Sequence, residues 1–103
     1  MLKAYAAQGD CLTLLDPGQG RTPDFSPDGR LFTFESTRCC ADGNYAIFVE
    51  PADGGVPRQI TACALNGNHG VWSPDAKTVA FAGVIPGKGP ARGIAVVASG
   101  IDE

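Results

Sequence analysis

Apolar side chains recur at every second position in two segments of the chain, 30–36 and 77–82, which lie 47 positions apart. Phe34 in the first segment corresponds to Phe81 in the second by that step. A period of two is typical of a β-strand with one buried face, and its agreement between the two segments favours strands over helices. We therefore predict a β-strand in each segment.

The same step connects a second pair of alternating segments. Ile47 and Val49 share one face of a predicted strand at 45–50, and Ile94 and Val96 repeat that face. No segment has the i, i+3, i+4 stripe of an amphipathic helix. We therefore expect essentially no helix.

Each copy opens with a short apolar segment, which we take as its first strand, and a turn motif joins that segment to the strand at 30–36 or 77–82. Proline pre-sets the first central dihedral of a tight turn, aspartate bonds a nearby backbone N–H, and glycine tolerates a positive φ. Ala76 replaces the glycine in the second copy, so we do not expect a glycine-only conformation there. The predicted turns comprise Ser26, Pro27, Asp28 and Gly29 in the first copy and Ser73, Pro74 and Asp75 in the second.

A fourth strand completes each unit. Asp53-Gly54-Gly55 is a hairpin signal that leads into a predicted strand at 57–61, and Leu12-Thr13 stands 48 positions before Ile60-Thr61. A repeat of roughly 20–50 residues indicates a stacked or radial architecture, and four short strands per repeat match one blade of a β-propeller. We predict an all-β chain that forms a single β-propeller segment over residues 1–103. Its two four-stranded antiparallel blades fall at about 10–52 and 57–99, in the strand order D-A-B-C-D-A-B-C.

The first copy resembles the blade consensus of the TolB-type propeller, a WD-repeat-like family. The resemblance rests on the segment 23–30, on Ile47-Phe48-Val49, and on Asp53-Gly54-Gly55 followed by Ile60-Thr61. Such propellers close a ring of about six blades. Two blades therefore imply a partial propeller cut from a longer chain, a homo-oligomer that completes the ring, or a small sandwich of two sheets. The resemblance also implies a periplasmic or extracytoplasmic protein, although the sequence as written shows no signal peptide.

Net charge and the length of the apolar runs exclude two kinds of binding partner. The net charge is −3 and the arginines are scattered singly, whereas binding to a phosphate backbone needs clustered Lys and Arg. We therefore expect no nucleic acid. No apolar run approaches the 18 or so residues of a membrane-spanning helix, so no membrane span is expected. A protein or peptide partner fits better.

The four cysteines, Cys11, Cys39, Cys40 and Cys63, fit no C-x2-C zinc or redox pattern. In a reducing compartment all four would be small hydrophobic residues. In an oxidising one Cys63 would pair with Cys39 or Cys40. The propeller resemblance implies that the loops carrying these cysteines emerge on the same face.

No catalytic, cofactor or metal site is predicted. His69 is the only histidine and has no partner that the sequence identifies, and Asp28 and Asp75 recur as turn residues. Phe25 and Trp72 are expected to be core anchors between the blades. Binding residues concentrate on loops. The candidate residues for a binding face, all on loops expected at one end, are Arg38, Asp42, Asn44, His69, Lys88 and Arg92.

These patterns favour a non-catalytic module that binds or scaffolds a protein or peptide, as the resemblance to TolB implies. One alternative is the propeller portion of a peptidase of the prolyl-oligopeptidase or tricorn type, which would act in substrate gating. A reading frame that continues into an α/β-hydrolase would support that alternative. The other is a truncated fragment with no function of its own.

Overall fold

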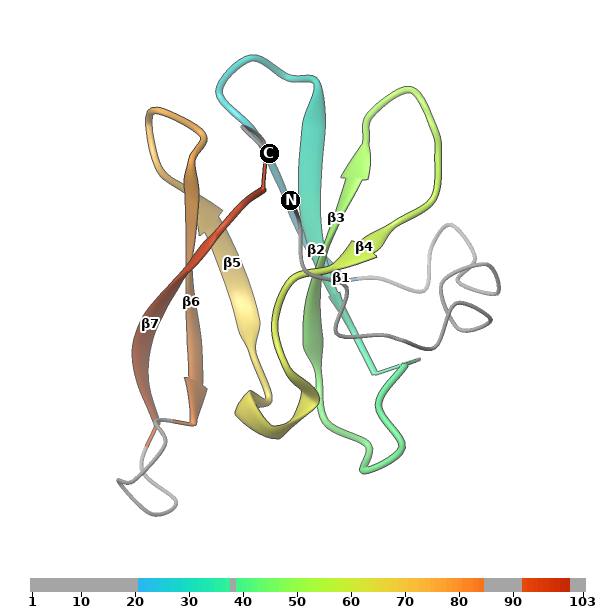
Figure 1. The fold of residues 1–103 in the computed structure, drawn as a ribbon, viewed down its shortest axis with the longest axis vertical. Coiled ribbons are helices and arrows are strands. Elements are labelled where there is room, and N and C mark those ends of the chain that lie inside the picture. Colours follow the sequence, from blue (N-terminus) through green and yellow to red (C-terminus); the bar gives the residue numbers. More distant parts are fainter. Residues whose placement is uncertain (1–20, 38, 85–91, 101–103) are drawn as a thin grey trace.

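The computed structural model of the chain describes residues 21–37, 39–84 and 92–100, which form two antiparallel β-sheets (Figure 1). The first sheet has the strand order β1-β2-β3-β4 and the second has the order β5-β6-β7. Within the described range the only helix is a single 3-10 turn, η1. The elements are β1 (Arg21–Phe25), β2 (Leu31–Ser36), β3 (Ala46–Pro51), β4 (Arg58–Gln59), η1 (Cys63–Leu65), β5 (Asn68–Trp72), β6 (Thr78–Val84) and β7 (Arg92–Ala98).

The prediction of an all-β chain with antiparallel sheets is confirmed. The hairpin predicted at Asp53-Gly54-Gly55 also forms, because β4 pairs with β3, with Phe48 opposite Gln59. β4 therefore belongs to the first sheet, whereas the predicted blade bounds group the segment 57–61 with the strands that follow it. The second sheet consequently has three strands among the described residues rather than four. The strand expected around Leu12-Thr13 lies outside the described residues.

Side-chain alternation divides the first sheet into two faces. In the register of β2 and β3, Phe34 lies opposite Phe48 and Glu35 lies opposite Ile47. One face therefore carries the phenylalanines, whose rings at positions 34 and 48 stack with centroids 5.4 Å apart. The other face carries Ile47 and Val49, which pack against the second sheet.

The main core lies between the two sheets. It joins Ile47 and Val49 of β3 to Trp72, Val79 and Phe81 of the second sheet. Full burial of one such side chain contributes roughly 1.5–3 kcal/mol, so this cluster is the principal apolar link between the sheets. The structure contradicts one expectation here, because Phe25 is 58% exposed whereas its repeat equivalent Trp72 is 7% exposed. Trp72 is covered by the first sheet, and no described sheet covers Phe25 in the same way.

Hydrogen bonds connect the first sheet to β5 as well. An Asp24 carboxylate oxygen accepts the Trp72 backbone N–H at 3.1 Å, and the Asp24 carbonyl accepts the Trp72 indole N–H at 2.9 Å. The buried Glu35 carboxylate accepts the His69 N–H at 2.7 Å. The Thr33 hydroxyl lies 3.5 Å from the Gly70 carbonyl oxygen. We call Asp24, Thr33 and Glu35 the polar anchors of the first sheet.

The β1–β2 and β5–β6 turns have the same conformation. Gly29 has φ +74° and Ala76 has φ +63°, so alanine occupies the left-handed region that the sequence suggested it would avoid. A residue other than glycine pays about 1–2 kcal/mol for this conformation. The local hydrogen bonds of the Ser-Pro-Asp segment hold the turn in place despite that cost.

Candidate functional site

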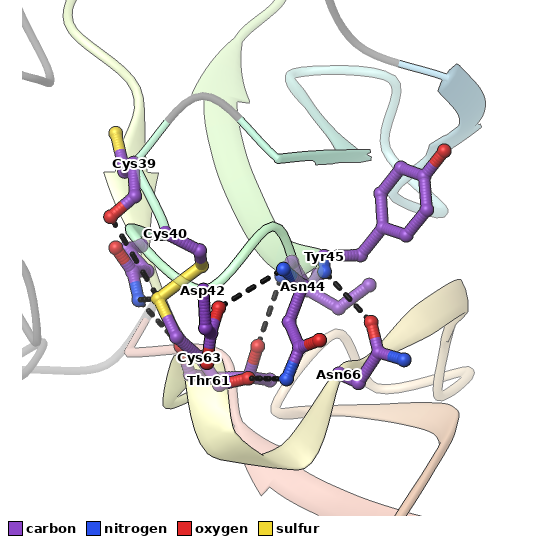
Figure 2. The surroundings of a disulfide bond; sticks show 10 residues. Cys39, Cys40, Asp42, Asn44, Tyr45, Thr61, Cys63 and Asn66 are labelled. Carbon is purple, nitrogen blue, oxygen red and sulfur yellow. Dashed lines mark hydrogen bonds between the residues drawn. A yellow bond between two sulfur atoms is a disulfide. The ribbon is translucent and has the colours of Figure 1, made fainter.

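The β2–β3 loop and the connector from β4 to β5 lie together at one end of the molecule, opposite the Ser-Pro-Asp turns (Figure 1). A disulfide between Cys40 and Cys63 joins them, with an S–S distance of 2.11 Å and a sequence separation of 23 (Figure 2). Of the two cysteines that the sequence offers as partners for Cys63, the structure selects Cys40. We call the described residues 39–45 and 60–69, together with Arg92, the loop end.

Hydrogen bonds reinforce the disulfide. The Asn44 side-chain amide donates to the Cys63 carbonyl at 3.1 Å, and the Tyr45 backbone N–H donates to the Asn66 side-chain oxygen at 2.7 Å. Figure 2 shows the Asn44 contact beside the disulfide and the Tyr45–Asn66 contact farther along the loop. Asp42 tightens the loop itself, because its carboxylate accepts the Asn44 N–H at 2.9 Å. The loop is thus fixed to the connector at three successive points.

Arg92 reaches the same connector from the second sheet. Its guanidinium donates to the Asn66 carbonyl at 3.0 Å and lies 3.4 Å from the Asn68 side-chain oxygen and 3.3 Å from the Ala82 carbonyl. His69 follows Asn68 in β5. Its side chain is exposed and its backbone φ is +57°. The structure therefore brings four of the predicted binding residues to one end: Asp42, Asn44, His69 and Arg92. Arg38 and Lys88 lie outside the described residues.

Asn66 is a residue of this end that the sequence reasoning did not single out. It has φ +48° and ends η1, and it accepts from Tyr45 through its side chain and from Arg92 through its carbonyl. Asparagine is one of the few residues that tolerates the left-handed region. The dipeptide Asn66-Gly67 was the signal in the sequence for a sharp turn here.

The two turn aspartates lie at the opposite end and bond within their own turns. The Arg30 backbone N–H and the Ser26 hydroxyl donate to Asp28 at 3.0 and 2.7 Å and lower the pKa of its carboxyl. In the second turn the Ser73 hydroxyl and then the Lys77 backbone N–H lower the pKa of Asp75. Both carboxylates are acceptors that close their turns, and they belong to separate turns rather than to one site.

Among the described residues no group of three or more His, Cys, Asp or Glu side chains is placed to hold a metal ion. None of the described helical residues forms a segment that is long and apolar enough to cross a membrane. Glu50 is the described group whose pKa is raised, because partial burial on β3 disfavours its charged form. The loop end therefore offers hydrogen-bonding and charged side chains on loops that a disulfide and hydrogen bonds hold together.

Comparison with known proteins identifies the fold. The structure is similar to the solved structure of a candidate TolB from Agrobacterium tumefaciens, with a TM-score of 0.61 and 22% sequence identity over 77% of this chain. The fold is TolB-like. The matched region spans 29% of that protein's length. No family model and no curated protein matches the sequence.

Proposed function

We propose that the chain is a non-catalytic binding or scaffold module, built from two TolB-like propeller blades, which contacts a protein or peptide through its loop end. The similarity of the two sheets to the TolB fold supports the proposal of a propeller-type binding module. Loops at one end of a rigid β-scaffold are a common location for binding residues. The two sheets would then act as the frame that positions the loops.

The observation that carries the proposal is the cross-linking of the loop end. The Cys40–Cys63 disulfide and the hydrogen bonds of Asn44 and Tyr45 fix two separate loops relative to each other. Ordering of loops on binding costs free energy, and a surface that is already ordered avoids that cost. Exposed Asp42, His69 and Arg92 side chains stand on this fixed surface.

Selection from a displayed library of random peptides tests the proposal, with the folded, oxidised chain as the target. Affinities of the enriched peptides are then measured for Asp42→Asn and His69→Asn. Asparagine at 42 retains an oxygen that can accept the Asn44 N–H, and asparagine at 69 tolerates the positive φ, so both changes preserve the backbone. We expect affinities at least tenfold weaker for one or both variants.

Asp53→Asn is the matched control, because Asp53 is exposed in the turn at the opposite end of the molecule. Its affinities should equal those of the unchanged protein. Enriched peptides that respond to Asp53→Asn and ignore both loop-end variants would overturn the assignment of the binding surface. A selection that enriches no peptide above an unrelated β-protein would overturn the binding function.

A further inference from the structure

The outer face of the second sheet exposes apolar side chains that no other described element covers. Ile94 is 73% exposed and Val96 is 64% exposed, whereas their repeat equivalents Ile47 and Val49 are 0% and 6% exposed beneath the second sheet. In the strand register Val96 lies beside Ala80 and Ala80 lies beside Val71, which is itself exposed. Contiguous exposed apolar surface of this kind marks an interaction site.

This face lacks the polar anchors of its covered equivalent. The 47-residue step places Val71, Ala80 and Ala82 where the first sheet has Asp24, Thr33 and Glu35. In the first sheet two of these side chains accept backbone N–H groups of β5, from Trp72 and His69. A further sheet of the same kind would present its equivalent N–H groups to valine and alanine, which offer no side-chain acceptor. Unpaired N–H groups in such an interface are costly, so head-to-tail continuation of the stack is disfavoured.

The shape of the face suits a second copy of itself. Alanine at positions 80 and 82 makes β6 a shallow trough, and the larger Ile94 and Val96 make the neighbouring β7 a ridge. Around a two-fold axis the ridge of one copy fits the trough of the other, and the reverse contact forms at the same time. Among the described residues the one charged side chain on the face, Arg92, lies at its end and is bonded to the β4–β5 connector. Two such faces therefore meet without burying an unpaired charge.

We propose that this chain forms a two-fold symmetric dimer in which the β5-β6-β7 sheets of two copies pack face to face through Ile94 and Val96 against Ala80 and Ala82. Packed sheets lie about 10 Å apart with interdigitated side chains. Three strands of this length cover roughly 14 by 23 Å, which is small for a protein interface. We accordingly expect a dimer with a dissociation constant in the micromolar range. The surface adjoins the loop end at Arg92, but its apolar contacts use none of the side chains changed in the peptide-binding test, so the two proposals can fail separately.

Sedimentation velocity of the 103-residue oxidised chain from 1 to 500 µM tests it. We expect a concentration-dependent species of twice the 10.6 kDa monomer mass. Val96→Asp should weaken the dimer at least tenfold, and Ala80→Leu, which fills the trough, should weaken it as well. Val56→Asp is the matched control, because Val56 is 58% exposed on the turn between β3 and β4. It should leave the dimer unchanged.

Three results would overturn the proposal. One is a monomer across the whole concentration range, and another is a discrete trimer, as a closed ring of copies would give. The third is a dimer that survives Val96→Asp and is lost in Phe25→Asp, which would place the contact on the first sheet. Trp72 fluorescence during urea unfolding verifies that each variant is folded, so loss of the dimer is separated from loss of the fold.

Discussion

Replacement of Cys40 and Cys63 together by alanine removes the cross-link between the β2–β3 loop and the connector. The other two cysteines are kept, so the change is confined to one disulfide. A disulfide stabilises a protein mainly by restricting its unfolded chain, and the effect grows with the length of the closed loop. The separation of 23 residues corresponds to about 3.4 kcal/mol at 25 °C on that entropic model.

The side chains themselves add a smaller contribution. Cys40 is buried in the phenylalanine-rich cluster on the outer face of the first sheet, so loss of its sulfur costs about 1 kcal/mol in addition. A valine pair at the same positions restores the apolar volume but, like the alanine pair, cannot form the cross-link. The valine pair should therefore lose about 3.4 kcal/mol and the alanine pair about 4.4 kcal/mol, which corresponds to falls in Tm of roughly 15–30 °C.

Equilibrium urea unfolding followed by fluorescence measures these losses, because Trp72 is the only tryptophan and lies between the sheets. Domains of this size have total stabilities of about 5–15 kcal/mol, so both variants should remain folded in the absence of urea. Losses below about 1 kcal/mol in both pairs would refute the entropic reasoning. A large loss for alanine with none for valine would assign the effect to packing instead.

Three further results follow from the hydrogen bonds and close contacts. Asp24→Ala should cost about 2 kcal/mol in urea unfolding, because it leaves the backbone N–H of the buried tryptophan without its acceptor, whereas Asp53→Ala should change stability by less than about 0.5 kcal/mol. Ser73→Ala should raise the pKa of Asp75 toward 3.8 in a carboxyl NMR titration, and more than the equivalent change does in the first turn, where a backbone N–H is the larger cause. Because the pKa of Asp75 is lowered on folding, its stabilising contribution is present above about pH 4 and lost as pH falls through the folded value; an unchanged acid transition in Ser73→Ala would contradict this. Gly83→Ala should lower the melting temperature, because a Cβ there would lie 2.8 Å from a backbone carbonyl of η1, and an unaltered melting temperature would show that the contact can relax.

The strands and their faces were predictable from the sequence because each is a local, period-two pattern that appears twice. The sequence placed Ile47 and Val49 on one face, and these residues do share the face that packs on the second sheet. The exposure of Phe25 was not predictable in the same way. It depends on whether another sheet stands beside β1, and that is a property of the assembly rather than of the local pattern.

The loop end was predictable only as a set of loops. The propeller resemblance implies that the β2–β3 loop and the connector share one end, but it does not specify which cysteine of the vicinal pair meets Cys63. That choice depends on the course of the loop, which Asp42 and Asn44 fix by hydrogen bonds. The role of Asn66 arises from a contact with Tyr45 over 21 positions, and no local pattern encodes such a contact.

The polar anchors have a dynamic consequence. Asp24, Thr33 and Glu35 all contact β5, whereas β7 lies at the far edge of the sheet, where Ile94 and Val96 face solvent and Ala95 and Val97 pack against the core. Regions with few buried contacts open first in native-state hydrogen exchange. The amides of β7 should therefore exchange faster than the His69 and Trp72 amides of β5, which bond side chains of the first sheet, so that the sheet opens from its outer edge. A partner that covers β7 would slow the opening of the whole sheet without touching the loops.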